Sequence, residues 1–388
     1  MSGHPDAVHS VSSALSGPAR PAGRTLRMLI VSASMGAGHD TVARELARRA
    51  RSRGHRASVV DLLRLLPAGS GTALRSFYRS SVRHYPWAYA GLYRAFLRPG
   101  TRYRPSGLPL ARLAGGPVAE LAERTEADVV VSVFHLAAQL TGHLRAEGRL
   151  RCPSAVCLTD FAVHRQWLHP GNDVYLCLTD QVAWEVGRSI TVPVETTGPV
   201  VAPGFFAPAA GASAWRRRFE RYAPGRPPVL LSAGAWGAAP GLEDTARLLA
   251  AAGYLPVVLC GRNERLRARA SGVPGALAVD WVTDMPGLLR AARVLVDNAA
   301  GQTAVQALAS GLPVVGHRPL PGHGAEGVAR MAALGVSEAA PDGPALLRAL
   351  GRLSADAPER DRGIARGREL FRADALARVE ALADSFAG

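Results

Sequence analysis

Residues 28–39 read Met-Leu-Ile-Val-Ser-Ala-Ser-Met-Gly-Ala-Gly-His and contain the pattern that decides the fold. Met28–Ser32 is a short apolar run of the kind that forms a buried strand. A glycine-containing turn follows, and the segment near Thr41–Arg53 then predicts a helix. Strand, turn and helix in this order begin a doubly wound α/β domain, which binds ligands at the carboxyl ends of its strands. We therefore expect His39 to lie at such an edge.

The same alternation continues through both halves of the chain. Further strands and helices are predicted at Ala57–Leu62, Asp128–Val133, Ser154–Leu158, Pro228–Ser232, Gly241–Ala252, Leu255–Cys260, Ala276–Val279, Met285–Ala292, Val294–Asp297, Thr303–Ser310 and Pro313–Val315. Buried runs that alternate with helices are typical of parallel sheets covered on both faces. The 388 residues suit two such α/β domains better than one core.

Composition along the chain predicts five segments. These are a disordered tail rich in Ser, Gly, Pro and Ala (1–26), a first Rossmann-like domain (27–200), a proline-rich linker (201–227), a second Rossmann-like domain (228–360) and a C-terminal helical segment that packs back on the first domain (361–388). The tail has no apolar centre, and no apolar run reaches the ~18 residues that cross a bilayer. We therefore expect a protein of the cytoplasm.

Charge and cysteine usage narrow the class of partner. The net charge is +15, and every basic side chain apart from histidine is an arginine. Such an excess favours anionic surfaces, namely nucleic acid, acidic lipid or phosphorylated substrates. The four cysteines (Cys152, Cys157, Cys177 and Cys260) lie in apolar runs without metal-ligand spacing. Reduced, buried thiols and no metal site are predicted.

Two loops of the first half carry polar groups after predicted strands. Gly38 and His39 end the first loop, where the glycine lets a ligand approach and the imidazole is suited to remove a proton. Asp160, His164 and Trp167 follow the strand at 154–158, and Asp160 could orient a histidine or receive a hydroxyl proton. The alternative is structural: His39 would begin a helix, Asp160 would cap one, and Trp167 would belong to the core.

The second half contains two glycine loops that indicate a nucleotide-diphosphate site. Gly234 and Gly237 follow one strand, and Gly301-Gln302-Thr303 opens a helix after another. Both loops can present main-chain N–H groups to phosphate oxygens. The chain has no Walker A lysine and no G-x-G-x-x-G spacing, which disfavours a kinase or a dehydrogenase.

Residues 62–119 form a basic and aromatic segment with nine arginines and no acidic side chain. Arg75, Arg79 and Arg83 recur every four residues and so share one face of a helix, with Trp87 beyond them. This pattern suits the interface of an anionic bilayer. The alternative is a solvated basic face over a packed aromatic core. No nucleic-acid motif accompanies the charge, so no nucleic-acid partner is expected.

Together these motifs resemble the monogalactosyldiacylglycerol synthase and processive diacylglycerol glucosyltransferase family, which is related to the glycosyltransferase that makes lipid II. The resemblance covers roughly residues 28–350. Its matching pieces are the loop that ends at His39, Thr159-Asp160-Phe161 with His164 and Trp167, Thr197–Val200, Cys260–Asn263, Trp281–Met285, Gly301–Leu308, Gly311–Pro313 and Pro321–His323.

The resemblance implies a GT-B fold, in which two Rossmann-like domains face each other across a cleft. It implies an inverting, metal-independent transfer of a hexose from a UDP-sugar to a lipid hydroxyl, with no cofactor, on the inner face of the cell membrane. His39, with Asp160, would act as the base. The implied donor-binding residues are Gly234, Gly237, Asn263, Trp281, Val282, Gly301, Gln302, Thr303, Gln306 and His323, and the implied acceptor or membrane contacts are Gly38, His164, Trp167, Arg75, Arg79, Arg83 and Trp87.

Several positions depart from the family pattern. Gln306 replaces a usual Glu, His323-Gly324 a usual Gln-Glu pair, and Gly327 a usual Asn, while Asn298 and Ala300 also differ. Two alternatives therefore remain: an enzyme like the UDP-sugar 2-epimerases, or a relative that binds UDP-sugar or lipid without catalysis.

Overall fold

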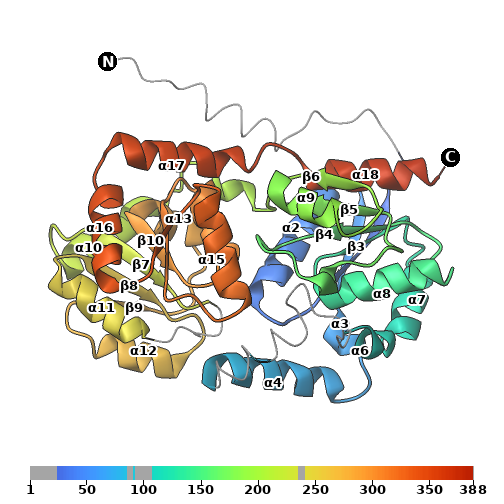
Figure 1. The fold of residues 1–388 in the computed structure, drawn as a ribbon, viewed down its shortest axis with the longest axis horizontal. Helices are drawn as coiled ribbons and strands as arrows, with labels where there is room; N and C mark the ends of the chain where they lie inside the picture. Colours follow the sequence, from blue (N-terminus) through green and yellow to red (C-terminus); the bar gives the residue numbers. More distant parts are fainter. Residues whose placement is uncertain (1–23, 85–90, 92–106, 235–240, 388) are drawn as a thin grey trace. The chain divides into compact units, whose positions relative to one another are not determined.

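The computed structural model describes residues 24–84, 91, 107–234 and 241–387 (Figure 1). Two compact units are present. The first contains the described residues up to 81, those between 87 and 200 and those from 371 onward, and the second contains those of 82–86 and 201–370. Trp87 and Gly237, predicted site residues, lie outside the described residues, as do residues 1–23 of the predicted tail.

The first unit is built on a parallel sheet of six strands in the order β2-β1-β3-β4-β5-β6. The strands are β1 (Arg27–Ser32), β2 (Arg56–Asp61), β3 (Val129–Ser132), β4 (Ser154–Cys157), β5 (Val174–Cys177) and β6 (Val194–Thr196). Leu29 of β1 is in register with Ser58 of β2 and with Val130 of β3. The chain thus leaves β1 toward one edge and returns to its other side, which makes the β1/β3 junction a topological switch point.

Helices cover both faces of this sheet. They are α2 (Ala37–Ser52), α3 (Leu62–Leu65), α4 (Ser70–His84), α6 (Leu108–Arg112), α7 (Gly115–Arg124), α8 (His135–Ala146), α9 (Asp180–Gly187) and α18 (Ala375–Ser385), with a 3₁₀ turn η1 (Arg165–Trp167). Met28 and Ile30 point into a core shared with α2 and α18, whereas Leu29 and Val31 point into one shared with α3, α6, α7 and α8. Alternate side chains of one strand therefore fill two cores.

The second unit repeats this plan with the strand order β12-β11-β10-β7-β8-β9, all parallel. Its strands are β7 (Pro228–Ser232), β8 (Leu255–Leu259), β9 (Leu277–Val279), β10 (Val294–Asp297), β11 (Val314–His317) and β12 (Glu338–Ala340). Its helices are α10 (Ala212–Tyr222), α11 (Leu242–Ala251), α12 (Glu264–Ser271), α13 (Met285–Ala291), α14 (Gln302–Ala309), α15 (His323–Ala333), α16 (Gly343–Ser354) and α17 (Pro358–Glu369), with a 3₁₀ turn η2 (Pro203–Phe205). The switch point lies between β7 and β10.

The predicted fold class is confirmed, because both halves are parallel α/β sheets covered by helices. The segment 201–227, expected to be a linker, instead holds η2 and α10 and is part of the second unit. Its arginine-rich stretch forms the amphipathic helix α10, which packs on α13 and buries Phe219. In the predicted segment 361–388, residues up to 370 complete α17 in the second unit, and α18 belongs to the first.

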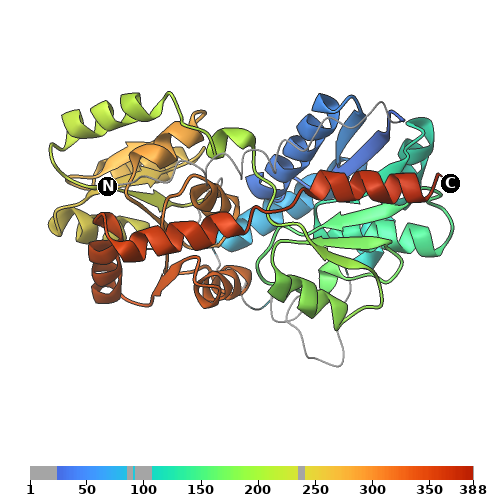
Figure 2. The same ribbon diagram turned by 90° about the horizontal axis from the view of Figure 1, so that it is seen from above.

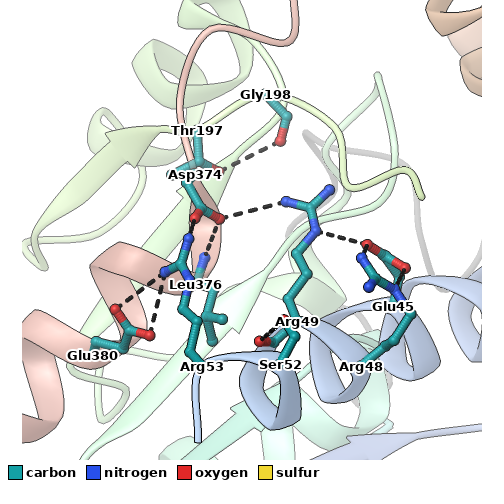
Figure 3. A network of polar contacts seen from close by, with 10 residues as sticks. All are labelled: Glu45, Arg48, Arg49, Ser52, Arg53, Thr197, Gly198, Asp374, Leu376 and Glu380. Atoms are coloured by element: carbon teal, nitrogen blue, oxygen red, sulfur yellow. Dashed lines mark hydrogen bonds and ion pairs between the residues drawn. The ribbon is translucent and has the colours of Figure 1, made fainter. Parts of the chain in front are cut away.

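Helix α18 is held on the first unit by a buried ionic cluster. Figure 2 shows the C-terminal helix lying over this unit, and Figure 3 shows the cluster. Asp374 accepts the Leu376 N–H at 3.0 Å and pairs with Arg49 and Arg53 of α2. Arg53 also lies 3.2 Å from Glu380 of α18. The carboxylates are almost fully buried, so the ions are stable only because they are paired.

We expect Asp374→Asn to lower the free energy of unfolding of this unit by about 1–3 kcal/mol. The amide can still cap α18, but the charge opposite two arginines is lost. Asp374→Ala, which also removes the cap, should cost about 1 kcal/mol more. Thermal unfolding and amide hydrogen exchange of α18 measure the effect, with the exposed Glu123→Gln on α7 as the control. Equal midpoints for Asp374→Asn and Glu123→Gln would contradict the role of this cluster.

Candidate functional site

His39 lies at the switch point of the first unit, in the first turn of α2. Its Nδ1 is 2.9 Å from the carbonyl oxygen of Val133, just after β3, and 3.1 Å from Oγ1 of Thr159, just after β4. A carbonyl oxygen can only accept, so the contact with Val133 requires a proton on Nδ1. The neutral imidazole then has its basic nitrogen at Nε2. The fold thereby fixes the tautomer that a general base needs.

Asp160 and Trp167 are connected to this histidine through the Thr159 hydroxyl. The Trp167 indole N–H donates to Asp160 at 2.8 Å, and the Thr159 hydroxyl lies 3.4 Å from the same carboxylate. A Thr159 hydroxyl that donates to Asp160 can accept from the His39 Nδ1–H. Asp160 is therefore linked to His39 through Thr159, which orients the ring and stabilises its positive form.

His164 and Trp167 were predicted to contact the acceptor, but their side chains are 4% and 0% exposed. The His164 ring packs edge-on against His135 with centroids 5.0 Å apart, and Trp167 lies 6.3 Å from His39. Both residues therefore belong to a buried cluster of aromatic rings that also includes His135 and lies next to His39. The core interpretation of Trp167 is the one that the structure supports.

Serine–carboxylate pairs hold the loop before His39. The Ser34 hydroxyl donates to Asp61 at 2.6 Å, and Asp61 also accepts the Leu63 N–H at the start of α3. One turn into α2, Asp40 accepts from Ser32 at the end of β1, at 2.7 Å. Gly38 is half-buried within this fixed segment, in the first turn of α2.

Helix α4 presents an exposed basic surface. Arg75 and Arg79 are exposed, and Phe77 is 59% exposed, so this ring is not part of a packed core. The side chain of Arg83 lies outside the described residues. Among the helices that the structure describes, none combines the length and hydropathy needed to span a bilayer.

In the second unit, a buried carboxylate shapes the loop after β10. Asp297 is 4% exposed and accepts N–H groups of Ala299 and Ala300 at 3.0 and 2.7 Å. The Ser232 hydroxyl, at the end of β7, also donates to it, which links the two strands of the switch point. Burial raises the pKa of Asp297, and these hydrogen bonds oppose that rise. Sequence reasoning missed Asp297, although its place between a strand and the glycine loop could have indicated it.

Helix α14 begins directly after this loop. Its N-cap is Gly301, which has no side chain that could cap the helix. Gln302, Thr303 and Gln306 are half-buried along one side, while Ala304 and Val305 pack inward. The predicted diphosphate-binding residues thus share one helix end, whose partial positive charge favours an anion.

Helix α15 starts beside the same loop, with His323 as its first residue. A Cβ on Gly324 would lie 3.0 Å from the Asn298 carbonyl oxygen, so the glycine permits this close approach. Gly324 thus lets α15, which begins at His323, pack closely against the loop that contains Asn298.

The remaining predicted donor-binding residues that the structure describes lie after the carboxyl ends of β7, β8 and β9. Trp281 is 46% exposed, and the Arg262 guanidinium carbon lies 4.6 Å from its ring centroid. Val282 is half-buried beside it. Asn263 caps α12 by accepting the Leu266 N–H at 3.1 Å, so its Oδ1 is already engaged. Gly234, after β7, is exposed with a positive φ of 64°.

Two units of this topology give the chain the GT-B fold that is found in solved glycosyltransferases. The family model described as monogalactosyldiacylglycerol (MGDG) synthase matches residues 39–201. A processive diacylglycerol β-glucosyltransferase of Bacillus pumilus is 25% identical over 309 residues, which are 76% of this chain and 78% of the relative. The resemblance predicted from the motifs is confirmed.

Solved structures agree on the fold. MurG of Acinetobacter baumannii is 14% identical, with 93% of this chain and all of that one covered and a TM-score of 0.55. Alr3699/HepE of Anabaena, solved in complex with UDP-glucose, is 13% identical, with 93% and 98% covered and a TM-score of 0.54.

We expect Asp297→Ala to lower the free energy of unfolding of the second unit by about 1–3 kcal/mol and to weaken nucleotide binding. The Ala299 and Ala300 N–H groups would lose their acceptor inside the protein. Thermal unfolding and UDP titration of the variant measure both effects. The exposed Asp280→Asn at the end of β9 is the control. Unchanged stability and UDP affinity would show that the loop does not depend on Asp297.

Proposed function

We propose that this protein transfers a hexose from a UDP-sugar to the hydroxyl group of a diacylglycerol-type lipid. The observation that carries the proposal is the fixed tautomer of His39, whose Nδ1 is bound to the Val133 carbonyl within the segment that matches the MGDG synthase model. The diacylglycerol named for the Bacillus pumilus relative supports the lipid acceptor, and the UDP-glucose complex of HepE supports the donor.

In this mechanism the Nε2 atom of His39 accepts the proton of the lipid hydroxyl. The acceptor oxygen forms a bond to the anomeric carbon from the face opposite the diphosphate, and the bond from that carbon to the diphosphate oxygen breaks. A single displacement inverts the anomeric configuration, and UDP leaves with the electron pair. Asp160, acting through Thr159, stabilises the imidazolium that forms.

The second unit would hold the donor without a divalent metal. The main-chain N–H groups of Gln302 and Thr303, at the positive end of α14, would stabilise the departing diphosphate. Trp281 and the main chain of Val282 would border the uracil. The amide oxygen of Gln306 would accept one hydrogen bond from a ribose hydroxyl, which is a weaker contact than a carboxylate makes. His323 would lie near the sugar.

The lipid acceptor requires access from a membrane. The exposed Arg75, Arg79 and Phe77 of α4 offer both charge and an apolar ring to an anionic surface. Each arginine near such a surface contributes about 1 kcal/mol at low salt. We propose that α4 holds the protein on the inner face of the cell membrane.

The direct test is UDP release from a panel of UDP-sugars, with and without anionic vesicles that contain diacylglycerol. We expect release only with vesicles, together with a new glycolipid. UDP binding without release under any condition would instead favour a relative that has lost catalysis, as the change at Gln306 allows. Interconversion of UDP-sugars without vesicles would favour an epimerase.

We expect His39→Gln to lower the turnover number by about 10²–10⁴-fold, because a glutamine cannot accept the proton. UDP affinity should stay unchanged, since the donor binds the second unit. His143→Gln on α8, also a half-buried histidine, is the matched control. An unaltered rate in His39→Gln would remove this residue from the mechanism.

A further inference from the structure

A recess of about 350 Å³ lies in the second unit and is lined by residues of α10, α13 and α17. Its wall includes Ala292, just before β10, and Leu312, just before β11. These are the amino ends of the strands, so the recess lies at the sheet edge opposite the loop after β10. Its volume is within the range of sites that bind small ligands, about 300–1,000 Å³.

Arginines dominate the charge of this recess. Arg216, Arg290 and Arg360 line it, and no carboxylate does. Arg368 lies against its wall, because a Cβ on Gly311 would be 2.9 Å from an Arg368 terminal nitrogen. Within the part of the chain that the structure describes, none of these four guanidinium groups forms an ion pair. Four cations without a paired anion repel one another.

Main-chain carbonyls satisfy only part of this donor capacity. Arg290 donates to the Phe205 oxygen at 2.9 Å, Arg360 to the Arg293 oxygen at 2.7 Å, and Arg216 to the Arg290 oxygen at 3.4 Å. Such contacts are common where helices end, and they give each side chain a structural role. A guanidinium has five N–H donors, however, so most of them remain for a ligand.

A buried hydroxyl supplies the independent observation. Ser310 lines the recess and is only 5% exposed, yet its Oγ has no hydrogen-bond partner among the described residues. The Nε of Arg290 is likewise buried and unsatisfied there. An unsatisfied buried polar group costs about 1–3 kcal/mol. A ligand with several acceptor oxygens would satisfy both groups and neutralise the arginines.

We propose that this recess binds a phosphate group, held by Arg216, Arg290, Arg360 and the Ser310 hydroxyl. The tetrahedral oxygens of phosphate suit forked guanidinium donors better than a single carboxylate does. The space exceeds that of a bare phosphate, so the group can be free or part of a lipid headgroup. This site lies at the C-terminal end of α14, whereas the donor would bind at the N-terminal end of the same helix.

The test compares Arg216→Gln with its helix neighbour Arg217→Gln. Both residues are exposed on α10, but only Arg216 lines the recess. Inorganic phosphate is titrated calorimetrically at low salt, and vesicles of phosphatidylcholine with and without phosphatidic acid are tested by sedimentation. Arg290→Gln and Ser310→Ala are measured in parallel, with thermal unfolding to verify their folding.

We expect Arg216→Gln and Arg290→Gln to weaken phosphate binding at least about 10-fold and Ser310→Ala about 2–10-fold, whereas Arg217→Gln leaves it unchanged. Loss in the phosphate arm alone identifies a free anion, and a matching loss on phosphatidic acid vesicles identifies a lipid headgroup. No binding in either arm, or equal binding by Arg216→Gln and Arg217→Gln, would overturn the proposal and leave these arginines a structural role only.

Discussion

The pairing of β1 with parallel neighbours on both sides is the constraint on which the first unit depends, and β7 has the same place in the second. Because the chain departs to one side of this strand and returns on the other, two loops diverge at its carboxyl end and leave room for ligands. In each unit a polar contact joins the two loops: His39 with the Val133 carbonyl, and Ser232 with Asp297. In both units the candidate site residues therefore lie at the switch point, where the order of the strands in the sheet reverses.

Charged side chains are used differently in three places. The cluster of Arg49, Arg53, Asp374 and Glu380 is paired throughout, which lets a segment more than 300 residues away in the sequence complete the first unit. Asp297 is satisfied by main-chain N–H groups and so determines a loop shape. The arginines around Ser310 are paired with no carboxylate within the described residues, and this difference separates a candidate ligand site from structural ion pairs.

Two departures from the family pattern, Ala300 and Gly327, depend on each other in the structure. Ala300 has a φ of 52°, a conformation that favours glycine, and its methyl group lies where a side chain at residue 327 would go. A Cβ on Gly327 would be only 2.9 Å from the Ala300 Cβ. The larger residue at 300 therefore requires the smaller one at 327, because the two compete for the same space beside the loop after β10.

The sequence by itself determined the parallel sheets, the glycine loops and the strands other than β5, β6 and β12, because apolar periodicity and turn residues act locally. It also predicted a role for His39 and for the residues at the N-terminal end of α14. Only the tertiary structure decided that Trp167 is buried, that Thr159 links Asp160 to His39, and that Asn263 caps a helix. The tertiary structure also showed that residues 212–222 form α10, which packs on α13, and that Arg216, Arg290 and Arg360 come together from three helices. Contacts between residues distant in the chain depend on how the sheets and helices pack, which no short stretch of sequence encodes.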